Sequence, residues 1–265
     1  MNSVDYKKKE TDEKIIDNEY DALYRVILTL SRKCNYRCPF CPHSTENIPN
    51  ELRTGFMTVE TALKLKELLK DKFKGVFSLS GFGEPTLNPD FLNIIDILKT
   101  VPGTSVDVIT NGTNTEVLKK CHADTIHISA YSKELYDKFI EEFKDDSRVE
   151  VLSQYNNTHF NNRAGNVKEE KNIPDTCCNI LFMKISVDYN GDIIKCCSDW
   201  DKSDLLGNIY KDDIWNIWIN QRKEDRIKAL RGKRKNIKVC NRCTAEGKLY
   251  GNNYKDFWEK YYAEH

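Results

Sequence analysis

The sequence lacks an excess of either charge and lacks long apolar runs. Its 265 residues carry 41 Lys and Arg against 41 Asp and Glu, so the formal net charge is zero. This balance argues against a protein that coats nucleic acid or an anionic membrane. No stretch approaches the ~20 apolar residues that a membrane-spanning helix needs. The first residues, MNSVDYKKKETDEK, lack the apolar segment of a secretory signal. We therefore expect a cytoplasmic protein without a nucleic-acid or membrane partner.

Histidine is also scarce, and the five histidines show no ligand spacing, so we assign them no chemistry. Cysteine, by contrast, is abundant for a chain without a secretory signal. A chain of this length can bury its own core, so disulfides are not expected. In a reducing compartment, clustered cysteines are more often metal ligands or catalytic thiols. The ten cysteines are Cys34, Cys38, Cys41, Cys121, Cys177, Cys178, Cys196, Cys197, Cys240 and Cys243.

Short apolar runs alternate with helical patterns over the first 155 residues. This alternation is typical of an α/β fold with a parallel sheet covered on its faces. The rhythm stops near Asn156, and a polar stretch leads to a different region with a hairpin signal at Asn190-Gly191. We predict strands at 22–31, 76–80, 105–110, 125–130 and 149–153, and further strands at 182–187 and 193–196. The predicted organisation is a flexible segment at 1–20, a first domain at 21–160 and a second at 161–265.

The first cysteine motif is Cys34-x3-Cys38-x2-Cys41, directly after the first predicted strand. Three thiolates at this spacing can each bind one iron of an iron–sulfur cubane and leave its fourth iron open to a chelating substrate. Zinc more often takes two separate pairs of ligands. A zinc site and unrelated core cysteines remain the alternatives.

This motif resembles the signature of the radical S-adenosylmethionine (radical SAM) superfamily. Three further features agree with it, namely Phe40, Gly81-Phe82-Gly83-Glu84-Pro85 after the second strand and Thr110-Asn111-Gly112 after the third. Phe82 interrupts the Gly-Gly pair that is usual in the family. The resemblance covers residues 22 to about 155.

The resemblance implies a partial, TIM-like β/α barrel and a [4Fe–4S] cluster on Cys34, Cys38 and Cys41. The cluster would cleave S-adenosylmethionine reductively to a 5′-deoxyadenosyl radical. Glycines 81 and 83 would let the backbone approach this ligand. The alternative to a cofactor-binding role is that Glu84 is a surface carboxylate and that Asn111-Gly112 is an ordinary turn. The residues implied to bind S-adenosylmethionine are Phe40, Gly81, Gly83, Glu84, Asn111 and Ser129.

The later cysteines resemble the auxiliary-cluster region called SPASM, or its shorter twitch form. No cysteine follows Cys243, so the supply fits one auxiliary [4Fe–4S] cluster. Four thiolates would fill all its irons and suit it to electron transfer. The alternative is a zinc ribbon. Similarity to a family member, the butirosin-pathway dehydrogenase of 2-deoxy-scyllo-inosamine, implies Cys178, Cys196, Cys240 and Cys243 as ligands. The choice within each cysteine doublet stays open.

That family member also has a stretch similar to Asn162-Arg163-Ala164-Gly165, so Arg163 is a candidate for binding substrate or cofactor; a solvated side chain is the alternative. The main hypothesis is a radical SAM oxidoreductase that oxidises a small polyol or aminocyclitol with the auxiliary cluster as electron acceptor. A reduced flavodoxin or ferredoxin is the implied donor. A maturase of a ribosomal peptide and a non-catalytic iron–sulfur or zinc protein are the competitors. The ~20 residues before the first strand are too few for a peptide-recognition domain. No catalytic acid or base is assigned.

Overall fold

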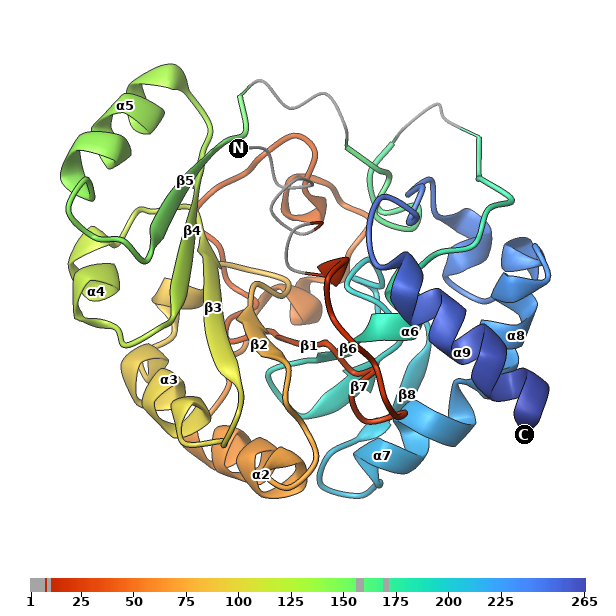
Figure 1. The fold of residues 1–265 in the computed structure, drawn as a ribbon. Coiled ribbons are helices and arrows are strands. Elements are labelled where there is room, and N and C mark those ends of the chain that lie inside the picture. Colours follow the sequence, from red (N-terminus) through yellow and green to blue (C-terminus); the bar gives the residue numbers. More distant parts are fainter. Residues whose placement is uncertain (1–7, 9–10, 156–159, 169–171) are drawn as a thin grey trace.

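The computed structural model describes residues 8, 11–155, 160–168 and 172–265. Their main element is a curved sheet in the order β5-β4-β3-β2-β1-β6-β7-β8 (Figure 1). Pairs from β5 to β6 are parallel, whereas β7 and β8 are added antiparallel. The strands are β1 (Arg25–Leu28), β2 (Val76–Leu79), β3 (Ser105–Thr110), β4 (Thr125–Ala130), β5 (Val149–Ser153), β6 (Lys184–Val187), β7 (Asp192–Ile194) and β8 (Leu205–Asn208).

Four helices connect the parallel strands and lie along the outer side of the curve (Figure 1). They are α2 (Val59–Leu69), α3 (Phe91–Lys99), α4 (Thr115–Lys120) and α5 (Lys133–Glu142). Thr58 and Ser132 cap α2 and α5, because each side-chain oxygen accepts a hydrogen bond from a backbone N–H three residues on, at 3.2 Å. Asn88, shortly before α3, donates its side-chain amide to Leu30 O at 2.7 Å and to Met57 O at 2.8 Å. The predicted alternation of strands and helices is confirmed.

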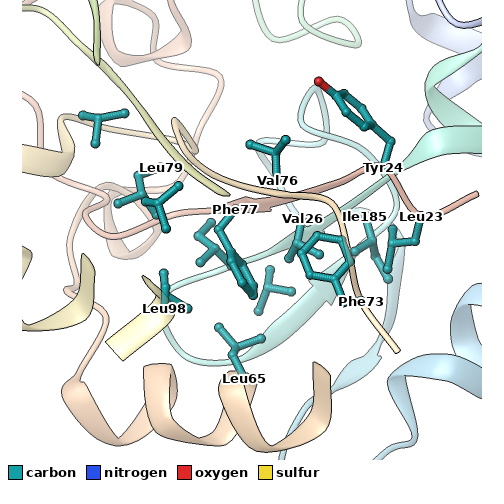
Figure 2. Close-up of a cluster of buried hydrophobic side chains, with 14 of the residues drawn as sticks. Leu23, Tyr24, Val26, Leu65, Phe73, Val76, Phe77, Leu79, Leu98 and Ile185 are labelled. Carbon is teal, nitrogen blue, oxygen red and sulfur yellow. The ribbon is translucent and has the colours of Figure 1, made fainter. Parts of the chain in front are cut away.

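The core lies between the sheet and these helices. Figure 2 shows Val26 of β1 and Phe77 of β2 packed with Phe73 and with Leu65 of α2, and none of the four has exposed surface. Each such buried side chain contributes about 1.5–3 kcal/mol. This packing holds the carboxyl ends of β1, β2 and β3 together. The segments that leave those three ends carry Phe40, Gly81, Gly83, Glu84 and Asn111, whereas Ser129 lies in β4 and Arg163 follows β5.

The sheet continues beyond the polar stretch, because β6 pairs in parallel with β1, with Arg25 opposite Lys184 and Leu28 opposite Val187. The predicted hairpin joins β6 and β7, and its Gly191 has a φ of 84°, which glycine adopts without strain. The strand predicted to start at residue 182 begins at Lys184, because Ile180–Met183 forms a short helix, α6.

The remaining helices pack beside β6, β7 and β8 (Figure 1). They are α7 (Ile214–Asn216), a π-helical turn (Ile217–Gln221), α8 (Lys223–Leu230) and α9 (Asn252–Glu264). Residues 1–20 were expected to be flexible; residues 1–7 and 9–10 of that stretch lie outside the described residues. Within the described part, Glu19 O accepts a hydrogen bond from Trp218 Nε1 at 2.8 Å. No helix of the described residues is long and apolar enough to cross a membrane.

Candidate functional site

The loop after β1 carries the first cysteine motif. Cys34, Cys38 and Cys41 are each partly exposed, and their thiols are close enough to interact. Burial raises the pKa of Cys38 to about 11, and the neighbouring Cys41 and Cys34 add to the rise. Burial also raises the pKa of Cys34, with smaller contributions that include those of Glu84 and Cys41. Burial raises the pKa of all three thiols, so they resist ionisation, and a bound metal is what would make them thiolates.

Glu84 ties the end of β2 to the end of β3. It is 2% exposed, so the alternative of a surface carboxylate is wrong. Its Oε1 accepts hydrogen bonds from Thr86 N, Thr86 Oγ1 and Thr110 Oγ1 at 3.1, 2.6 and 2.7 Å. Its Oε2 accepts one from Asn111 N at 2.8 Å. Burial raises the pKa of Glu84, although these hydrogen bonds oppose the rise. A buried carboxylate of this kind suits a cationic ligand such as an ammonium group.

Asn111 connects β3 to the cysteine loop. Its Nδ2 donates to Asn35 Oδ1 at 2.8 Å and lies 4.0 Å from Cys34 Sγ. Its Oδ1 accepts from Thr113 N at 3.1 Å and from Thr113 Oγ1 at 2.8 Å. Gly112 follows with a φ of 74°. The Asn-Gly turn therefore exists, and it also places Asn111 against the cysteine loop.

Gly81 and Gly83 allow close contact between two loops. A Cβ on Gly83 would lie 2.3 Å from Ser31 O and 2.5 Å from Lys33 O. A Cβ on Gly81 would lie 2.0 Å from Thr29 Oγ1. We expected the absence of a Cβ to make room for a ligand. The structure places a different neighbour there. At both glycines, the position that a Cβ would take lies against the segment between β1 and Cys34.

An aromatic cavity of about 620 Å³ opens beside Cys38. Phe40 stacks on Phe160 with ring centroids 4.0 Å apart and 4° between the planes. The Tyr131 hydroxyl is hydrogen bonded to Ser129 and Cys38, and burial raises its pKa. Flat aromatic walls suit a planar ring. The lining residues are Asn35, Tyr36, Arg37, Cys38, Pro39, Phe40, Tyr131, Gln154, Tyr155 and Phe160.

Arg163 lies on a strained turn near Cys41. Arg163, Ala164 and Gly165 all have left-handed backbone, with φ of 48°, 52° and 88°, which is uncommon for the first two residues. The half-buried guanidinium makes no hydrogen bond or ion pair with the described residues. Burial raises the pKa of the Cys41 thiol, and the charge of Arg163 opposes that rise. A strained turn that presents a free cation at the cysteine loop is a feature of binding sites.

The four predicted auxiliary ligands come together. Burial raises the pKa of Cys240 to about 12, with further rises caused by Cys178 and Cys243. Cys196 interacts with Cys178 and Cys243 as well as with its neighbour Cys197, so the geometry does not separate the two members of that doublet. Cys177 interacts with its neighbour Cys178, and also with Lys255 and Glu259 of α9 and with Arg234.

Two residues that the sequence did not single out surround this second cysteine group. Gly247 has a φ of 72°, and a Cβ there would lie 2.4 Å from Cys178 Sγ. Arg234 is 1% exposed, and its Nε finds no acceptor among the described residues. Within the same residues, no three His, Cys, Asp or Glu side chains converge on one metal ion. An iron–sulfur cluster, by contrast, takes each thiolate on a different iron, and the all-sulfur donor sets of both groups fit such clusters.

Sequence comparisons extend this description. The model of the Radical SAM superfamily matches residues 28–161, and the model of an iron–sulfur cluster-binding domain, SPASM, matches residues 177–244. Human molybdenum cofactor biosynthesis protein 1 is 33% identical over 88 residues, which are 33% of this chain but 14% of that protein. The chain therefore spans only a small part of this relative.

A match over most of both chains is found with the S-adenosyl-L-methionine-dependent 2-deoxy-scyllo-inosamine dehydrogenase of Niallia circulans. The two are 26% identical over 243 residues, covering 84% of this chain and 94% of that protein. The crystal structure of BtrN in complex with AdoMet and 2-DOIA matches with a TM-score of 0.71 and 22% identity, over 86% of this chain and 97% of that one. This structural likeness shows a shared fold.

Proposed function

Because the chain belongs to the radical SAM superfamily, we propose that it oxidises a secondary alcohol on a small polyol or aminocyclitol. The predicted family and the partial-barrel fold with a small C-terminal iron–sulfur domain are confirmed. The chain is an S-adenosylmethionine-dependent iron–sulfur enzyme. The choice of substrate rests on the dehydrogenase that matches over 94% of its length. The carrying observation is the group of four cysteines around β6, the strand that pairs with β1, because such a group supports a second cluster as electron acceptor.

Oxidation of an alcohol to a ketone removes two electrons and two protons. When bound, the cofactors supply a 5′-deoxyadenosyl radical that takes one hydrogen atom, and an acceptor for the second electron. The remaining hydroxyl proton passes to a base or to water. Cys34, Cys38 and Cys41 would hold the reactive cluster, and Cys178, Cys196, Cys240 and Cys243 the auxiliary one.

The other site residues have separate parts in this proposal. Glu84 would bind the ammonium group of S-adenosylmethionine through its buried carboxylate. Phe40 would pack near the adenine ring, supported by its stack on Phe160. Gly81 and Gly83 would position the Glu84 loop, and Asn111 and Ser129 would add polar contacts. Arg163, with its free guanidinium, would bind a hydroxyl or carboxylate of substrate or cofactor.

We also propose a cytoplasmic location and a reduced flavodoxin or ferredoxin as electron donor. All ten cysteines are free thiols in the structure. A reducing compartment would keep them so. The donor is proposed from the need for one low-potential electron per cleavage of S-adenosylmethionine.

Deuterium transfer tests the proposed reaction. We would incubate the anaerobically reconstituted enzyme with S-adenosylmethionine, dithionite and 2-deoxy-scyllo-inosamine deuterated at its carbinol carbons. Mass spectrometry should find one deuterium in 5′-deoxyadenosine together with the ketone. If 5′-deoxyadenosine forms without deuterium while a precursor peptide supplied in parallel is modified, the chain is a peptide maturase and the proposed substrate is wrong.

Cysteine variants test the two ligand sets. Replacing Cys34, Cys38 and Cys41 with Ala should abolish 5′-deoxyadenosine formation. Replacing Cys240 and Cys243 should spare that cleavage but block ketone formation. The matched control is Cys121→Ala, because Cys121 is buried at the end of α4 and donates to Leu118 O instead. Ketone formation by the Cys240 and Cys243 variant would remove the proposed electron acceptor.

A further inference from the structure

Arg234 occupies a buried position against the second cysteine group. It begins a short 3-10 turn, Arg234–Asn236, six residues before Cys240. Its Nη1 donates to Ala245 O at 2.6 Å and its Nη2 to Cys243 O at 3.3 Å. The guanidinium thus holds the backbone that follows Cys240 in place. Its Nε is buried and has no acceptor among the described residues.

The charge of Arg234 lacks a carboxylate partner in the described part of the chain. Nearby Lys195 is different, because it forms ion pairs with both Asp204 and Asp225. A buried, unpaired cation is unfavourable unless a negative group faces it.

Cysteine thiols face the Arg234 guanidinium. The cysteines that interact with it are Cys178, Cys240 and Cys243. Cys243 also supplies the backbone carbonyl that accepts from Nη2 at 3.3 Å. The buried Nε–H without an acceptor among the described residues therefore belongs to the same cluster of side chains as these three sulfurs.

We propose that Arg234 is a positioning residue for the auxiliary cluster, directing its Nε–H at a sulfur of that cluster and making the cluster easier to reduce. The inference rests on the proposed ligand set of Cys178, Cys196, Cys240 and Cys243. Hydrogen bonds to sulfur and nearby charge are two of the quantities that set the potential of such clusters. The reaction adds one electron to a centre that its thiolates already make negative. A fixed cation stabilises the reduced form more than the oxidised form.

A redox titration monitored by electron paramagnetic resonance tests this inference. The background is the full chain with Cys34, Cys38 and Cys41 replaced by Ala, so that only the auxiliary cluster contributes. We compare Arg234→Gln and Arg234→Lys with Arg231→Gln, which removes an exposed arginine three residues away. Arg234→Gln should lower the reduction equilibrium constant tenfold or more, which corresponds to 59 mV for one electron. The reduction potential of Arg234→Lys should lie between those of Arg234→Gln and the background, and the potential of Arg231→Gln should equal that of the background.

Equal potentials for Arg234→Gln and Arg231→Gln would overturn the inference. If Arg234→Gln binds no iron, pulsed spectroscopy of the reduced background with ¹⁵N-labelled arginine decides. A nitrogen coupling that survives Arg231→Gln and disappears in Arg234→Lys supports the assignment, and its absence from the background overturns it. A background that holds no cluster at all would instead refute the four-cysteine ligand set, and this inference with it.

Discussion

Replacement of Gly83 by alanine tests whether the loop after β2 positions the reactive cysteines. The new Cβ would lie 2.3 Å from Ser31 O and 2.5 Å from Lys33 O, whereas an ordinary contact begins near 3.4 Å. The two loops must therefore separate by about an ångström. The hydrogen bond from Glu84 N to Lys33 O, now 2.8 Å, would then be lost.

The expected cost follows from these two effects. Overpacking costs typically 1–3 kcal/mol, and a lost backbone hydrogen bond about 0.5–1.5 kcal/mol. Together they predict a loss of roughly 2–4 kcal/mol in the free energy of unfolding. For a chain of this size that lowers Tm by about 5–15 °C. Movement of the segment that leads to Cys34 should also weaken the spectral response of the cluster to S-adenosylmethionine.

The assay is thermal unfolding of the anaerobic protein, combined with paramagnetic resonance before and after S-adenosylmethionine is added. The control is Gly232→Ala, since Gly232 has a φ of 67° but its nearest atom is 3.9 Å away. That variant should show backbone strain of about 1 kcal/mol and an unchanged spectral response. A Gly83→Ala protein as stable as Gly232→Ala, with an intact response, would refute the steric argument.

Three further predictions concern other parts of the two sites. Gly247→Ala should displace Cys178 and lower the iron content of the auxiliary site alone. The control Gly251→Ala should keep both clusters, because its Cβ meets the flexible side chain of Met183. Equal iron content in the two variants would contradict this prediction. Burial raises the pKa of Glu84, so the apo protein should gain stability as pH falls through that raised pKa, with the gain complete below the ordinary Glu value. The thermal stability of Glu84→Gln, measured across the same pH range, should lack this part of the pH dependence. Parallel plots of Tm against pH for the two proteins would contradict the prediction. Phe160→Ala removes the stack on Phe40. Because such a ring pair contributes ~0.5–1.5 kcal/mol, binding of S-adenosylmethionine measured by equilibrium dialysis should weaken by about 2–10-fold. Unchanged binding would show that this stack does not support the cofactor.

The sequence predicted the first half of the fold well, because each strand there is a short apolar run, and the runs of β2 and β3 end close to Gly81 and Asn111. Residues 105–110 and 125–130 form strands at the predicted bounds. It did not predict β8, whose Leu205 is half exposed and whose run is interrupted by Gly207. Nor did it predict that Lys184 would lie opposite Arg25, because strand pairing between distant segments leaves no local pattern.

The candidate site was predictable where a motif has fixed spacing. The cysteine triplet, Glu84 and Asn111 do lie at neighbouring strand ends. The reason given for the glycines failed, because sequence alone does not tell which neighbour a missing Cβ would meet. Phe160, Tyr131 and Arg234 were missed because each acts through a contact with a distant segment.

The parallel pairing of β1 with β6 sets how far apart the two redox centres can be. One cysteine group follows β1, and members of the other precede and follow the β6–β7 hairpin. A ladder of main-chain hydrogen bonds therefore spans the gap, and the buried ion pair of Arg32 with Asp188, at 2.9 Å, fastens the ends of the same two strands. Electron tunnelling falls off steeply with separation. In the proposed reaction the electron leaves the substrate radical, so a substrate held beyond the end of β1 would lie at a distance from its acceptor that the pairing of β1 with β6 helps to set.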